Sequence, residues 1–302
     1  MKLVLALVGG FGVRETAAAF VSSHAAVEKR LTRAKKTLKE SGPLFDIADA
    51  ADFAQRLPAV QRALYLIFSE GYHGASARAV VRAYLCTEAI RLTLLLAKHP
   101  LAARPSTHAL LALMYLDAAR LPARIDPAGN LTPLLDQDRS CWDRAMIVEG
   151  VRWLERSATG SEVSRYHVEA AIAAVHARAQ TVGETDWGEI VSHYDRLTTI
   201  APSPIVALNR AIAIAQRDGP VRGLEAIDAI AKREVLDGYP FYHAARGELE
   251  VRRANDAQAC HHFRAAIGAA RNAEERRFYE SRLAACEART AEAVGLRRTP
   301  RG

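Results

Sequence analysis

The sequence contains few residues that break regular structure or cross-link it. Its 302 residues include 18 glycines, 12 prolines and four cysteines. Such contents exclude collagen-like and linker-dominated chains. The chain also lacks an apolar run of about 18 residues, which argues against a transmembrane helix and a membrane partner. β-branched residues come mostly singly, whereas Ala, Leu, Arg and Glu are plentiful. This composition predicts an all-α protein.

The four cysteines lie far apart, at Cys86, Cys141, Cys260 and Cys286. None has the spacing of a metal site or a redox pair, so we expect free, mostly buried thiols in a reducing, cytoplasmic compartment. The tripeptide that starts at Cys260 continues with two histidines. Adjacent side chains on a helix diverge by about 100° and do not converge on one ion. We therefore predict no metal and no cofactor.

Positive charge is concentrated at the N-terminus. The formal net charge is +7, and the first 42 residues hold eight Lys or Arg against three Glu. A basic segment on a nearly neutral body favours a polyanionic partner. A solvated basic helix is the alternative.

Residues 3–13 are apolar and follow Met1-Lys2, a pattern also found in secretion signals. Gly9, Gly10 and Gly12 interrupt the run, which favours a different interpretation. One helix ends before Gly9, a second covers 14–20, and 21–23 form a turn.

A third helix is expected from His24 to about Lys39. Its apolar stripe has the 3.6-residue period and consists of Val27, Leu31, Ala34 and Leu38. The opposite face carries Lys29, Thr32, Arg33 and Lys36. A helix-turn-helix with this basic face fits the major groove of DNA. An ordinary helical hairpin is the alternative.

These residues carry a resemblance to a known family. The segments LALVGGF (5–11), ETAAAF (15–20) and VEKRLTRAKK (27–36) resemble region 4 of extracytoplasmic-function sigma factors, which reads the promoter −35 element. The long C-terminal extension of one subgroup is similar to residues 56–72, 110–114, 134–140, 142–144, 170–177 and 201–211. The resemblance implies a sigma-type initiation factor with promoter DNA and the RNA polymerase core as partners. The implied DNA-binding residues are Ser23, His24, Ala26, Lys29, Arg30, Arg33 and Lys36.

The family also has a region 2, which binds the polymerase clamp and melts the −10 element. This chain starts inside region 4 and has no room for region 2, so we expect that it does not initiate transcription alone.

The rest of the chain reads as helices. After a linker at 41–43 we expect helices at 47–56, 58–70, 77–98, 106–120, 138–158 and 163–178. A small β-hairpin is expected near 123–134, because Asp126 to Asn130 form a turn sequence between apolar flanks. The expected domains are a partial region 4 at 1–41, a helical extension at 44–180, repeats at 181–290 and a flexible tail at 291–302.

The last third contains an internal repetition. Ala211, Gly223, Ile227 and Ile230 are followed 36 residues later by Gly247, Ala259, Phe263 and Ala266. This period is close to that of tetratricopeptide repeats, which stack helix pairs into a solenoid and bind protein or peptide ligands. An irregular bundle is the alternative. A scaffold of this kind without DNA binding is the second functional hypothesis.

No enzyme is predicted. Polar residues gather at Asp136, Asp138, Arg139, Trp142 and Asp143, with Glu70 and His176 elsewhere. We interpret Asp136 and Asp138 as helix caps, Arg139 as a partner of either, and His176 as a packing histidine. The spacing of Tyr65, Phe68 and Tyr72 indicates core positions. The sequence contains no phosphate-binding loop, nucleophile elbow or metal signature.

Overall fold

The computed structural model describes residues 24–40, 50–73 and 81–298. Within these ranges the protein is all-α, as predicted, with twelve α-helices, four short 3₁₀ helices and no β-strand. None of the described helices combines the length and hydropathy needed to cross a bilayer. The α-helices are α3 His24–Glu40, α4 Ala50–His73, α5 Ala83–Lys98, α6 Pro105–Ala118, α7 Arg144–Ser157, α8 Arg165–Arg178, α9 Trp187–Ile200, α10 Pro204–Asp218, α11 Pro220–Asp228, α12 Pro240–Arg252, α13 Asp256–Ala269 and α14 Ala273–Arg298.

The chain divides into two compact units. The first takes the chain up to Ala123 together with Asp138–Arg178, and the second takes Arg124–Gln137 and everything from Ala179 onward. The predicted domains 44–180 and 181–290 remain predictions, because contact within the chain defines compact units and not functional domains.

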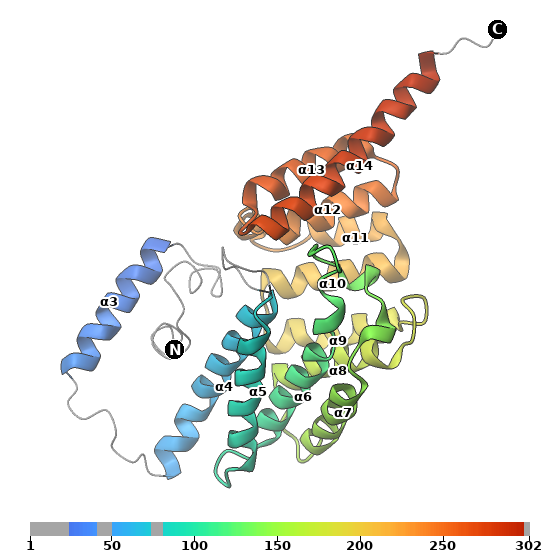
Figure 1. Ribbon diagram of the computed structural model, residues 1–302. Helices are drawn as coiled ribbons and strands as arrows, with labels where there is room; N and C mark the ends of the chain where they lie inside the picture. The colour runs from blue at the N-terminus through green and yellow to red at the C-terminus, as the bar shows by residue number, and fades with distance from the viewer. Residues whose placement is uncertain (1–23, 41–49, 74–80, 299–302) are drawn as a thin grey trace. The chain divides into compact units, whose positions relative to one another are not determined.

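Helix α6 is the centre of the first unit. It contacts α4, α5, α7 and α8, and the labels in Figure 1 show these helices gathered around it. Helix α6 carries apolar residues on all of its sides, as is typical of a helix enclosed by other helices. Leu110, Leu111 and Met114 are fully buried there. At Gly150 on α7, an added Cβ would lie 2.6 Å from Cγ of Leu116, so only glycine permits this approach of α7 to α6.

Helix boundaries differ from the expectation at two places. Helix α4 continues through Pro58, where we predicted a break. Proline removes one backbone donor, but burial of Leu57, Leu64 and Phe68 holds both parts of α4 in line. The expected helix 138–158 is divided into a 3₁₀ turn at Arg139–Cys141 and helix α7. Tyr72 and Phe68 are buried, as their spacing predicted.

The turn at 126–130 forms without the expected β-hairpin. Asp126 N–H donates to the carbonyl of Asn130 at 2.9 Å, and Gly129 adopts a positive φ of 83°. A single antiparallel bridge joins Ile125 to Leu131. The pairing stops because Pro133 cannot donate to a ladder and a 3₁₀ turn begins at Leu134. A two-stranded hairpin is therefore absent from the described residues.

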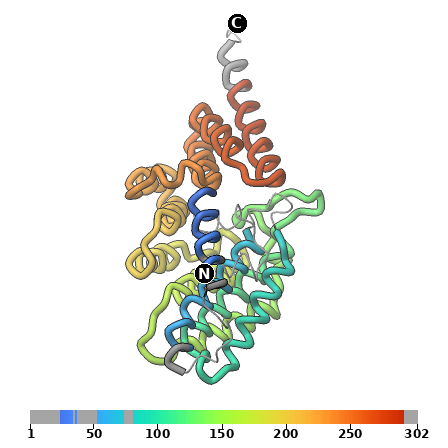
Figure 2. The backbone as a smooth tube through the Cα atoms, turned by 90° about the vertical axis from the view of Figure 1, so that its left-hand side faces the viewer, coloured from blue at the N-terminus to red at the C-terminus, as the bar shows by residue number. Residues whose placement is uncertain are grey.

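Helices α9 to α14 form the second unit and follow one another through short loops, as the tube in Figure 2 shows from yellow to red. Each helix contacts the next along the chain. A Cβ added at Gly223 would lie 2.3 Å from Cβ of Ala215, and one added at Gly247 would lie 2.7 Å from Cε1 of Phe263. Glycine thus permits close contact within both pairs, α10–α11 and α12–α13.

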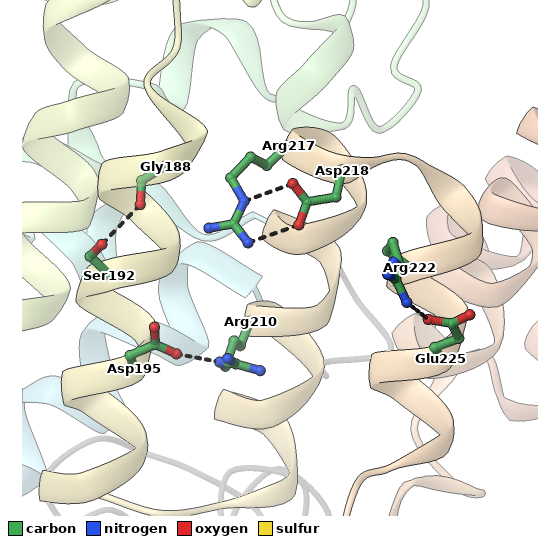
Figure 3. A network of polar contacts seen from close by, with 8 residues as sticks. All are labelled: Gly188, Ser192, Asp195, Arg210, Arg217, Asp218, Arg222 and Glu225. Carbon is green, nitrogen blue, oxygen red and sulfur yellow. Dashed lines mark hydrogen bonds and ion pairs between the residues drawn. The ribbon is translucent and has the colours of Figure 1, made fainter.

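The exposed surface of this unit carries several ion pairs. Figure 3 shows Asp195 of α9 accepting from Arg210 of α10 at 2.6 Å. Arg217–Asp218 and Arg222–Glu225 pair locally at 2.8 Å. At its far end α14 reaches Arg298, so it extends into 291–302, where we expected a flexible tail.

Candidate nucleic-acid interface and a buried arginine cluster

Helix α3 separates apolar from basic residues. Val27 and Leu31 are buried, whereas Lys29, Arg30, Arg33 and Lys36 are exposed. Lys29, Arg33 and Lys36 lie on the side of the helix away from its buried stripe, as the periodicity predicted, and Arg30 lies beside the stripe.

The start of α3 holds the remaining implied DNA-binding residues. His24 is exposed and its Nδ1 lies 3.9 Å from a carboxylate oxygen of Glu28. Ala26 is half-buried. Ser23 and the first two helices of the expected helix-turn-helix lie outside the described residues.

The acidic residues of 136–143 act mainly at helix ends. Asp138 accepts from the Ser140 N–H at 2.9 Å, and Asp143 accepts from the Met146 N–H at 3.0 Å. Hydrogen bonding to Ser140 lowers the pKa of Asp138. Asp136 is not a cap: it ends the 3₁₀ turn 134–136. The hydrogen bond to Glu248 raises the pKa of Arg282, and the charge of Asp136 adds a smaller contribution.

The side chain of Arg139 is buried in the first unit. It is 4% exposed and donates from Nη1 to the carbonyl of His176 at 3.0 Å. Its guanidinium carbon lies 5.1 Å from the centre of the Trp142 ring. The carboxylate of Asp138 is engaged by a backbone N–H, and the side chain of Arg139 turns inward instead.

A second arginine contacts the same indole. The guanidinium carbon of Arg120 lies 5.5 Å from the Trp142 ring and 5.7 Å from the Tyr72 ring. Nη1 of Arg120 is 3.5 Å from Asp117. Trp142 is only 3% exposed. We call Arg120, Arg139 and Trp142 the buried arginine cluster.

His176 of α8 adjoins this cluster. Burial, followed by the charges of Arg120 and Arg139, lowers its pKa to about 3. The imidazole is therefore neutral at pH 7, in keeping with its predicted role as a packing histidine. Glu70 belongs to a different contact, a buried ion pair with Arg82 at 2.5 Å.

The structure also brings together two cysteines that the sequence left apart. Sγ of Cys260 on α13 lies 2.8 Å from Sγ of Cys286 on α14, and both residues are buried. Burial, together with the contact to Cys260, raises the pKa of Cys286 to about 12. Antiparallel pairing of the helices around the 270–272 turn was the signal that we missed. The described residues contain no group of three side chains suited to hold a metal ion.

Two comparisons with known proteins find sequences similar to this chain. Residues 56–158 match a family of unknown function (DUF6596). Over 284 residues the chain is 41% identical to an uncharacterized protein of Rhizobium meliloti (strain 1021). This match covers 94% of the chain and 66% of the relative, so the chain spans slightly less than two thirds of that protein. No solved structure matches the chain.

The matched family segment coincides with one of the two candidate sites. It contains Arg120, Arg139 and Trp142, whereas α3 lies outside it. The buried arginine cluster is thus formed within a segment that recurs as a family, apart from the basic helix.

Proposed function

We propose that this protein is a sigma-type transcription initiation factor that binds promoter −35 DNA and RNA polymerase, with a regulatory helical-repeat body. The observation that supports this most is the division of α3 between a buried stripe at Val27 and Leu31 and four exposed basic side chains. The proposal assigns the factor to the cytoplasm, with no cofactor and no enzymatic reaction of its own.

The basic side chains have the spacing that a DNA-reading helix needs. Lys29, Arg33 and Lys36 follow one another at four and three residues, which places them along one side of α3. In the proposed complex they contact phosphates and set the affinity. The start of the helix, at His24 and Ala26, lies near base edges and sets the sequence preference.

We further propose that residues 181–290 form tetratricopeptide-like repeats. The two copies of the 36-residue repetition correspond to the consecutive helix pairs α10–α11 and α12–α13. Ile227 and Phe263, which occupy the same position in the two copies, are both fully buried. A stack of such pairs offers a surface for a protein or peptide ligand.

DNA binding by the full chain tests the main proposal. The variant Lys29→Ala/Arg33→Ala is compared with the parent on a duplex that carries a −35 element, over a series of salt concentrations. Loss of two phosphate contacts is expected to weaken binding and reduce the slope of log K against log salt by about 1.8. The matched control, Lys98→Ala/Arg104→Ala, removes the same charge from exposed positions near α5 and α6. Equal losses in both variants would show that net charge, not α3, attracts the DNA.

A helical-repeat scaffold is the second candidate, favoured by the closely packed helix pairs at Gly223 and Gly247. The same titration discriminates between the two. A scaffold binds no duplex specifically, whatever the salt concentration.

A further inference from the structure

We propose that Cys260 of α13 and Cys286 of α14 form a redox-active dithiol that a hydroperoxide closes to an intrachain disulfide. The pair lies in the second unit, and its chemistry does not depend on the DNA binding proposed above. A disulfide at this place joins the last two helices covalently, so the state of the two thiols sets how firmly α14 is held.

The first argument is the distance between the two sulfur atoms. Sγ of Cys260 lies 2.8 Å from Sγ of Cys286. The S–S bond of a disulfide is about 2.05 Å long, so the sulfurs need to approach by less than about 1 Å for the bond to form. The other two cysteines of the chain, Cys86 and Cys141, belong to the first unit. The second unit therefore holds this pair alone.

The second argument is that polar contacts hold α13 and α14 in this register. Sγ of Cys286 donates to the carbonyl of Asp256 at 3.1 Å, and the carboxylate of Asp256 accepts from Nε of Arg289 at 2.9 Å. A further ion pair, at 2.6 Å, joins Arg264 of α13 to Glu287 of α14. The folded chain thus keeps the two thiols side by side, which makes the effective concentration of one thiol at the other high.

The third argument is that the two thiols have different surroundings. Cys260 is 5% exposed, whereas Cys286 is 0% exposed. Burial raises the pKa of Cys286 to about 12, so hardly any thiolate exists at this position at pH 7. The thiolate is the form of cysteine that attacks a peroxide. Cys260 is therefore the thiol that is oxidised first, and Cys286 is the thiol that resolves the product.

The reaction balances in two steps. The thiolate of Cys260 attacks one oxygen of the hydroperoxide, the O–O bond breaks, and Cys260 becomes a sulfenic acid. The alkoxide or hydroxide that leaves takes up the proton that the Cys260 thiol gave up. Sγ of Cys286 then attacks the sulfenic sulfur, and the S–S bond forms as the hydroxyl leaves as water with the proton of the Cys286 thiol. The two thiols lose two electrons and two protons in total, and the hydroperoxide gains them.

Peptide mapping of the full chain after treatment with hydrogen peroxide tests the pair. The remaining thiols are alkylated, the protein is digested without a reductant, and mass spectrometry locates each link. We expect one product, in which the peptides that contain Cys260 and Cys286 are joined with the loss of two hydrogens. Dithiothreitol should separate the two peptides again. The exposed Cys141 should be alkylated or oxidised without joining another cysteine.

Two serine variants test the order of the steps. Cys286→Ser lacks the resolving thiol, so a sulfenic acid should accumulate at Cys260 and be trapped by dimedone. Cys260→Ser should give at least about tenfold less dimedone label at Cys286, because thiolate is scarce there at pH 7. The matched control, Cys141→Ser, removes an exposed thiol and should form the disulfide as the parent does.

Two results would overturn the proposal. One is a folded parent protein in which peroxide oxidises Cys141 completely but leaves Cys260 and Cys286 as thiols. The other is a link that joins either of these two residues to a different cysteine. Equal dimedone labelling of the two variants would overturn the order of the steps. Circular dichroism establishes that each variant is folded, and if one fails to fold, the peptide map of the parent decides.

Discussion

Arginine side chains have different surroundings in the two units. In the second unit Arg271 bonds to Glu275, whose side chain is fully buried, and Arg282 bonds to Glu248. In the first unit Arg120 and Arg139 lie against the ring of Trp142. These two guanidiniums of the second unit thus face carboxylates, whereas the two guanidiniums of the first unit share one indole ring.

The two groups also differ in how their hydrogen-bonding atoms are satisfied. Glu275 also accepts from the backbone N–H of Arg271 at 2.9 Å, and Asn272 accepts from the Glu275 N–H at 2.8 Å. That arrangement pairs the charge of Arg271 with a carboxylate and also caps the start of α14, so it leaves no group for a ligand to bind. In the buried arginine cluster, Nε of Arg120 and Nε1 of Trp142 are buried and have no hydrogen-bond partner among the described residues. The predictions below test this contrast, from the largest effect to the smallest.

Removal of Glu275 should produce the largest loss of stability. Glu275→Ala leaves Arg271 partly buried without its carboxylate, and breaking a buried ion pair costs about 3–5 kcal/mol. Glu248→Ala is the matched control, because both partners of the Arg282 pair are about one third exposed and such pairs contribute about 1 kcal/mol or less. Urea unfolding of the two variants measures the difference. Equal losses would mean that the Arg271–Glu275 pair is not a structural element of the second unit.

Cross-linking of Cys260 and Cys286 should have the next largest effect. Diamide takes two electrons and two protons from the thiols, which forms the disulfide and leaves the reduced hydrazine. A link across 26 residues is expected to stabilise the α13–α14 pair by about 3 kcal/mol. Titration of free thiols should fall from four to two, and dithiothreitol should restore them. Loss of no thiols, or of those at Cys86 and Cys141 instead, would contradict the contact.

Acid should destabilise the first unit through His176. Its folded pKa of about 3 lies below its unfolded value of 6.5, so the unfolded chain takes up a proton first as the pH falls. The contribution to stability is complete above pH 6.5 and is lost progressively down to about pH 3. Between pH 7 and pH 5 the loss should be about 2 kcal/mol. The variant His176→Gln has no titrating group at this position. The difference between its pH profile of stability and that of the parent therefore isolates the contribution of His176. If the two pH profiles are parallel, folding does not lower the pKa of His176, and its side chain is in contact with water.

Much of the fold follows from the sequence, because helix formation depends on local composition and periodicity. The all-α class and the buried stripe of Val27 and Leu31 were predicted in this way. The continuation of α4 through Pro58 was not predicted, since contacts between residues that are distant in sequence hold α4 together there. The hairpin predicted near 123–134 did not form, because turn residues specify a turn but not the strands beside it.

The buried arginine cluster was beyond sequence reasoning for the same physical cause. Arg139 and Trp142 were recognised as a polar group, yet Arg120 comes from the turn after α6 and His176 from α8. Local rules place charged side chains outside and pair them with near neighbours such as Asp138. Only the packing of α6, α8 and the 139–141 turn decides that Arg139 points inward. Helix pairing around 270–272 likewise decides that Cys260 meets Cys286.

The smallest effect is expected at the surface pair Asp195–Arg210, which joins α9 to α10. The two side chains are separated by 2.6 Å but are 52% and 37% exposed. Water screens such a pair and holding two flexible side chains costs entropy, so its coupling energy should be about 0.2–1 kcal/mol. A double-mutant cycle with Asp195→Ala and Arg210→Ala measures this coupling. In 1 M salt, where the Debye length is about 3 Å, most of the coupling should vanish. A coupling energy close to that of the Arg271–Glu275 pair, or one unaffected by salt, would mean that burial does not set the strength of ion pairs in this unit. The contrast between its interior and its surface would then fail.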